Sequence, residues 1–112
     1  MLTIDKLKEF GADTSEGLDR CLGNEGFYLK MVDMGIRDEK FEQLGGVIES
    51  GNLDEAFELA HALKGVLGNL ALTPIFEPAS EMTENLRARI DMDYSALYSK
   101  VMEERAKLLE MM

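Results

Sequence analysis

Residues 52–72 read NLDEAFELAHALKGVLGNLAL, and apolar residues recur through this stretch with the 3.6-residue period of an α-helix. On a wheel turned by about 100° per residue, one half is wholly apolar and predicts the face that packs into a core. That half holds Ala56, Leu59, Leu63, Val66, Leu67 and Leu70. Asn52 is a favourable N-cap, and Asp54 suits the positive end of the helix dipole. We therefore expect a long amphipathic helix from Leu53 to about Leu72.

The rest of the chain has the same helical period, and no stretch alternates over the length of a strand. Two short helices are expected at the N-terminus, and the second of them is expected to stop at Gly23-Asn24. Phe27 is expected to face inward from the helix that follows. Longer helices are expected to begin near Asn24, Asp38, Asn52, Thr73 and either Asp91 or Asp93. Thr73 is expected to be an N-cap with Pro74 as the first helical residue, and a start nearer Pro78 is the alternative. These segments predict an all-α fold: an up-and-down four-helix bundle with short extra N-terminal helices, forming a single domain over residues 1–112.

The composition of the chain excludes several classes of function. The formal net charge is −10, which disfavours binding to nucleic acid or to anionic lipid because both need a basic surface. A single cysteine, Cys21, and a single histidine, His61, cannot supply a disulfide framework or a zinc site. No apolar run approaches the length of about 20 residues that crosses a membrane, and the N-terminus lacks a signal-peptide core. The sequence therefore favours a cytoplasmic protein.

His61 lies opposite the apolar half of the wheel, in the middle of the long helix. Gly65 and Gly68 follow it by one and two turns, almost in line, and together they cost the helix about 2 kcal/mol relative to alanine. Side chains on a helix lean toward its N-terminus, so a large residue at position 65 would cover the imidazole. Lys64 lies at i+3, close enough to share a ligand with His61. A neutral imidazole is a good nucleophile, and a nearby ammonium would stabilise an added phosphoryl group.

Simpler interpretations stay open for two of these residues. A lone histidine on a helix surface is commonly just solvated, and a lysine at i+3 adds little to the pattern. Phe57 falls within about 40° of His61 on the wheel, where an exposed ring would offer a docking surface for a partner. A neighbouring helix that covers this ring is an equally good interpretation of Phe57.

The run Ala60-His61-Ala62-Leu63-Lys64-Gly65, followed by Asn69-Leu70, resembles the signature of histidine-containing phosphotransfer (HPt) domains. The upstream run Ser50-Gly51-Asn52-Leu53-Asp54 is also similar to members of this family. The resemblance extends from about Phe41 to Glu84, with one departure at Ala71, where the family often has glycine. It implies a four-helix bundle with an exposed histidine that accepts a phosphoryl group from an aspartyl-phosphate on a response-regulator receiver domain.

The resemblance also implies a role for each residue of the motif. His61 would be the phosphoacceptor, Lys64 would stabilise the charge of the phosphoryl group, and Gly65 would give access, with Gly68 and Phe57 beside it for access or docking. The Mg²⁺ used in transfer would belong to the receiver, so no cofactor or metal is expected on this chain. The expected partners are a receiver domain and a hybrid sensor histidine kinase. The chain would then be a phosphocarrier without an ATP site, and nothing in the sequence demands a dimer.

Two alternative functions keep the helical fold. A binding module could dock a receiver or a kinase through the His61 face without any phosphotransfer, although a pure binder has no use for an unobstructed imidazole. A metal or haem bundle is disfavoured because ferritin-like sites need Glu-x-x-His motifs on two helices, which one histidine cannot supply.

Overall fold

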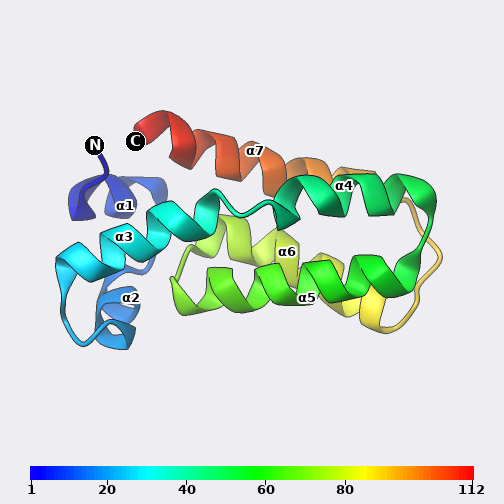
Figure 1. Ribbon diagram of the computed structural model, residues 1–112, viewed down its shortest axis with the longest axis horizontal. Coiled ribbons are helices and arrows are strands. Elements are labelled where there is room, and N and C mark those ends of the chain that lie inside the picture. The colour runs from blue at the N-terminus through cyan, green and yellow to red at the C-terminus, as the bar shows by residue number, and fades with distance from the viewer.

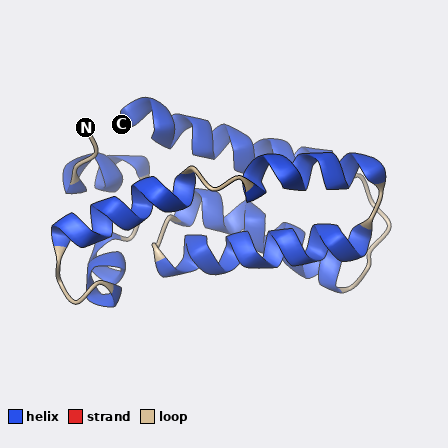
Figure 2. Cartoon of the chain, viewed as in Figure 1, coloured by secondary structure: helices blue, strands red, loops and turns tan.

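The computed structural model describes all 112 residues, and short loops join its helices without any strand (Figure 2). The helices in chain order are α1 (Ile4–Phe10), α2 (Thr14–Arg20), α3 (Glu25–Ile36), α4 (Lys40–Ser50), α5 (Leu53–Asn69), α6 (Thr73–Arg87) and α7 (Ser95–Met111). None of them combines the length and the apolar character that crossing a membrane requires. The prediction of an all-α fold is confirmed.

Helices α4 to α7 form the four-helix bundle, and each runs antiparallel to the one before it (Figure 1). In the bundle α5 packs between α4 and α6, and α7 closes the ring by contacting both α6 and α4. Helix α3 extends beyond the end of α4, separated from it by the break that begins at Arg37 (Figure 1). The short helices α1 and α2 lie at the same end of the bundle. The predicted up-and-down topology with extra N-terminal helices is therefore confirmed.

Side-chain caps fix where several helices begin. Thr3, Asp13, Asn24 and Asn52 each accept a hydrogen bond from a backbone N–H in the first turn of the helix that follows. Such a bond satisfies a donor that has no partner within the helix, which stabilises the helix start by about 1 kcal/mol. Helix α4 ends at Gly51, whose φ of 77° lies in the left-handed region that glycine adopts without strain.

One continuous core joins the bundle to the N-terminal helices. Helix α5 contributes Ala56, Ala60, Leu63 and Leu67, at the i+4, i+7 and i+11 spacing of one helix face. From the other helices the core takes the fully buried side chains Leu7, Tyr28, Val32, Ile36, Phe41, Leu44, Ile75, Met82, Leu86, Val101 and Leu108. This burial turns the opposite face of α5 toward solvent, and that face carries His61.

The predicted end of the long helix is three residues too late. Helix α5 ends at Asn69, because Ala71 adopts a left-handed backbone conformation with φ of 55°. Two backbone carbonyls freed by this turn find partners, since Leu70 O accepts from Tyr28 Oη at 2.8 Å and Ala71 O accepts from the backbone N–H of Asp13 at 2.9 Å. These contacts come from the N-cap of α2 and from α3, so the sequence around residue 70 does not reveal them.

Three further expectations about helix ends and faces are wrong. Leu72, not Thr73, is the N-cap of α6, and the helix continues through Pro78. The second helix ends at Arg20, ahead of the predicted stop at Gly23. The Phe27 side chain is 49% exposed, because the inward face of α3 is taken by Tyr28, Val32 and Ile36.

Candidate functional site

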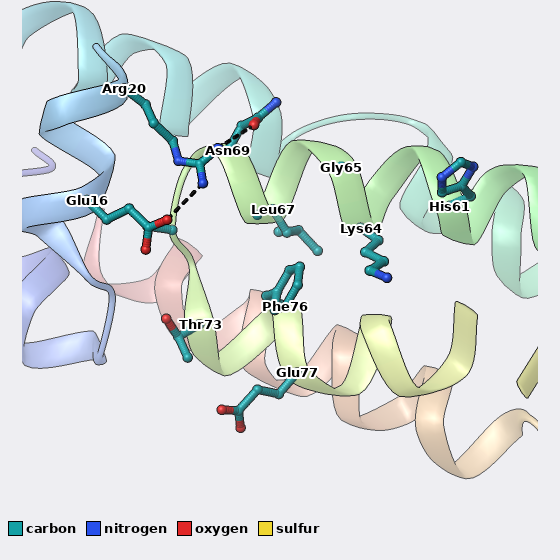
Figure 3. A pocket seen from close by; sticks show the side chains of 12 residues that line it. Glu16, Arg20, His61, Lys64, Gly65, Leu67, Asn69, Thr73, Phe76 and Glu77 are labelled. Atoms are coloured by element: carbon teal, nitrogen blue, oxygen red, sulfur yellow. Dashed lines mark hydrogen bonds and ion pairs between the residues drawn. The ribbon is translucent and has the colours of Figure 1, made fainter. Parts of the chain in front are cut away.

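His61 lies on the exposed face of α5, near the middle of the helix. Its neighbours Ala60 and Leu63 are buried in the core, which fixes the rotation of the helix and points the imidazole outward. In Figure 3 the ring projects from α5 on the side away from α6. The outward orientation predicted from the apolar pattern is confirmed, because His61 is exposed.

The imidazole of His61 stacks on the ring of Phe57, one turn earlier in α5. The two ring centroids are 5.4 Å apart and the ring planes are inclined by 17°. The guanidinium carbon of Arg87 lies 5.0 Å from the centroid of the Phe57 ring, and that of Arg89 lies 5.3 Å from it. Both distances are typical of cation–π contacts. Phe57 is therefore half-buried: it packs against the core, and His61 and two cations cover part of its ring.

Lys64 points toward α6 and not toward the imidazole (Figure 3). Its Nζ lies 3.1 Å from Oε2 of Glu84, and the other oxygen of that carboxylate, Oε1, lies 3.3 Å from Nε of Arg87. The hydrogen bonds from Lys64 and then from Arg87 hold the pKa of the Glu84 carboxyl below its ordinary value. The structure thus places Lys64 one turn from His61, as predicted, but already paired with a carboxylate.

The two glycines beside His61 have different surroundings. A Cβ atom added at Gly65 would meet no atom within 4 Å, so this position leaves open space next to the imidazole. At Gly68 an added Cβ would lie 3.1 Å from Cε1 of Phe76, whose ring packs against α5 there. Gly68 therefore makes room for a side chain of α6, whereas Gly65 keeps the surface around His61 clear.

A groove of about 500 Å³ begins at His61 and runs along the two glycines toward α2. Arg20 lies at the other end of this groove, where its Nη1 donates to Oδ1 of Asn69 at 3.0 Å and its Nη2 binds Glu16 at 2.8 Å (Figure 3). The sequence reasoning missed Arg20, Glu84, Arg87 and Arg89 as members of the site. Only the Glu84–Arg87 pair at i+3 and the Glu16–Arg20 pair at i+4 carried a signal in the sequence, because the other contacts depend on how the helices pack.

The arrangement of these side chains is suited to receiving an anionic group. It presents an exposed imidazole, with Lys64 one helical turn away and with Arg87 and Arg89 over the Phe57 ring that stacks on it. No set of three or more His, Cys, Asp or Glu side chains converges on a point that could hold a metal ion. An imidazole with nearby cations can accept a phosphoryl group and offset its negative charge.

A family model described as the Hpt domain matches residues 38–112, which include α4 to α7 and about two thirds of the chain. The chain belongs to the Hpt domain family. Hpt domains are phosphocarriers in histidine phosphotransfer relays, where they interact with receiver domains and histidine kinases, and they do not use ATP. Membership of the family thus connects the chain with phosphorelay signalling. No curated protein and no solved structure matches this Hpt chain.

Proposed function

We propose that the protein is a phosphorelay intermediate, which accepts a phosphoryl group on His61 and passes it to a second acceptor. The exposed imidazole of His61 in the middle of α5 carries this proposal, because it gives an Hpt chain a nucleophile that a partner can reach. The donor is an aspartyl-phosphate on a response-regulator receiver domain. In this proposal the Mg²⁺ used in transfer is bound by the receiver, and this chain needs no cofactor.

The proposed reaction is a single displacement at phosphorus. The lone pair of the unprotonated ring nitrogen of His61 attacks the phosphorus atom and forms an N–P bond. The P–O bond to the receiver's aspartate breaks, and its electron pair stays on the aspartate carboxylate. The other ring nitrogen keeps its proton, so the attack itself needs no base. The reverse displacement on a second receiver returns the phosphoryl group and regenerates the free imidazole.

The neighbours of His61 support the proposal through charge and access. Lys64 lies within reach of a group on His61, since residues at i and i+3 are neighbours on a helix surface. Gly65 leaves the space through which a receiver would bring its phosphoryl group. The groove that ends at Arg20 lies next to His61 and offers a surface on which that receiver could dock. Phe57 lies outside this groove, one turn before His61, and is a second docking candidate through the exposed part of its ring.

Label transfer from phosphorylated receivers tests the proposal. A panel of receivers from one organism, labelled on the aspartate, is incubated with the wild-type chain and with His61→Gln. We expect label that is stable to base and labile to acid on the wild-type chain and none on the variant. Because His61 is exposed, circular dichroism of the variant should match the wild type. Failure of every receiver to transfer label would overturn the proposal.

The test also separates a relay from a pure binding module. A receiver that binds equally well to wild type and to His61→Ala, without forming phosphohistidine, would favour a module that docks without chemistry. The cytoplasmic location and the monomeric state expected from the sequence stay predictions, which cell fractionation and analytical ultracentrifugation would check.

A further inference from the structure

The ammonium group nearest to His61 along α5 already has a partner, and that partner is shared. Lys64 Nζ lies 3.1 Å from Glu84 Oε2, while Glu84 Oε1 lies 3.3 Å from Arg87 Nε. Glu84 comes from α6, so the pair fastens the Lys64 side chain to the neighbouring helix, where it is only 27% exposed. Three charged groups thus form a cluster beside the nucleophile, with the carboxylate between two cations.

A phosphoryl group on His61 would change the balance of this cluster. It carries close to two negative charges near neutral pH and three strong acceptor oxygens, against one charge on the Glu84 carboxylate. It would also stand about one helical turn from Lys64, within reach of a long side chain. The phosphoryl group is therefore the stronger partner for Lys64 Nζ. Arg87 would still bind Glu84, so the carboxylate would not lose both of its partners.

We propose that Glu84 is a positioning residue that holds Lys64 against α6 until His61 carries the phosphoryl group, and that Lys64 then exchanges Glu84 for the phosphoryl oxygens. The inference rests on the proposed function and adds a residue on α6 to the reaction. The exchange breaks one ion pair and forms another, and it makes or breaks no covalent bond. Competition from Glu84 makes phosphohistidine less stable and the phosphoryl group easier to pass on.

The expected effect of removing Glu84 is modest because the pair is partly exposed. Exposed ion pairs contribute little, at most about a fivefold change in an equilibrium constant. Glu84→Gln should therefore shift the transfer equilibrium between a receiver and His61 toward phosphohistidine by about two- to fivefold. In the Lys64→Ala background the same substitution should shift it much less, because the competition no longer exists.

Glu81→Gln provides the matched control for this experiment. Glu81 is exposed on the same helix, three residues before Glu84, and it takes part in no ion pair. The Glu81→Gln substitution removes the same charge from α6 without freeing Lys64. If Glu81→Gln shifts the transfer equilibrium as much as Glu84→Gln does, the effect comes from net charge alone and the proposed exchange is overturned. A full effect of Glu84→Gln in the Lys64→Ala background would also overturn the exchange.

A second measurement does not depend on any receiver. His61 is phosphorylated chemically with phosphoramidate, and the ¹³C resonance of the Glu84 carboxyl group is followed by NMR at neutral pH. We expect phosphorylation to move this resonance to the position that it has in unphosphorylated Lys64→Ala. A Glu84 resonance that stays where it is in the unphosphorylated wild type would overturn the exchange. If no receiver transfers its phosphoryl group, the proposed function fails, and this measurement still decides the role of Glu84.

Discussion

Gly65 is the residue at which stability and phosphotransfer should change in opposite directions. It sits inside a helix, and an added Cβ would meet no atom within 4 Å. Gly65→Ala should therefore raise the free energy of unfolding by about 1 kcal/mol, since alanine is the better helix former. Gly65→Leu should also fold, but its side chain leans over His61 and should slow transfer by about 100-fold. Urea denaturation and label transfer measure the two effects.

Gly68 provides a matched comparison on the same helix. Its added Cβ would lie 3.1 Å from Phe76 Cε1, so the ring would have to move. Gly68→Ala should then gain less stability than Gly65→Ala, because the better helix propensity is offset by the displaced ring. Transfer by Gly65→Leu at the wild-type rate would show that Gly65 has no role in access.

The Glu84 carboxyl group should titrate below its ordinary pKa of 4.5, because Lys64 and then Arg87 donate hydrogen bonds to its charged form. A carboxyl with a lowered pKa contributes stability above the ordinary pKa and loses it as the pH falls through the lowered value. We expect Lys64→Ala to raise the pKa toward 4.5. A ¹³C titration of the unphosphorylated protein checks this, and an unchanged pKa in Lys64→Ala would show that the ion pair is absent in solution.

The sequence predicts which residue is exposed better than it predicts what that residue touches. The apolar face of α5 was sufficient to turn His61 outward, because burial of that face fixes the rotation of the helix. The pairing of Lys64 with Glu84 depends on the packing of α5 against α6, and the two residues are 20 positions apart. The covering of Phe57 by Arg87 and Arg89 depends on the same packing. Periodicity within one helix does not contain this information.

At the scale of elements, Tyr28 connects α3 with the end of α5. Its ring is fully buried, and its Oη donates to the carbonyl oxygen of Leu70 at 2.8 Å. Burial is the largest cause that raises the pKa of Tyr28 from 10.0 to about 12. A group whose pKa is raised by folding contributes its full stability below the unfolded value and loses it as the pH rises through the folded one. Stability should therefore fall between about pH 10 and pH 12.

Tyr28→Phe isolates this contribution. Loss of the hydrogen bond should cost about 1 kcal/mol at neutral pH, because the Leu70 carbonyl loses a donor. The variant should then lose less stability than the wild type as the pH is raised above 10. Urea denaturation at a series of alkaline pH values measures both effects. An equal decline in wild type and variant would show that Tyr28 does not titrate in this range.

Helix starts were easier to predict than helix ends. Asn24 and Asn52 cap α3 and α5 as expected, since a side-chain cap is a local interaction that the sequence displays. The end of α5 was missed because Ala71 adopts φ of 55° without being glycine. This turn is supported by hydrogen bonds from Asp13 to Ala71 O and from Tyr28 to Leu70 O, and both donors lie far away in the sequence. Tertiary contacts overrode the local pattern at this turn.

For the whole molecule, the question is whether α1 to α3 belong to the same folding unit as the bundle. The family model matches only residues 38–112, yet Leu7, Tyr28 and Val32 are fully buried in the core that α4 to α7 build. The two ends of the chain also meet, with the N-terminal amino group 2.7 Å from Met112 O (Figure 1). The single domain over residues 1–112, which the sequence predicted, stays a prediction that unfolding experiments can decide.

Leu7→Ala tests whether the chain is one domain. Leu7 lies in α1, outside the residues that the family model matches. Removing a fully buried leucine leaves a cavity, and such substitutions cost about 2–5 kcal/mol. If the chain is one domain, Leu7→Ala and Leu63→Ala should each shift one cooperative transition that circular dichroism and tyrosine fluorescence report together. Leu22→Ala is the control, because Leu22 is 95% exposed and its loss should change stability little. A second transition in Leu7→Ala, with the bundle still folded, would mean that α1 to α3 form a separate unit.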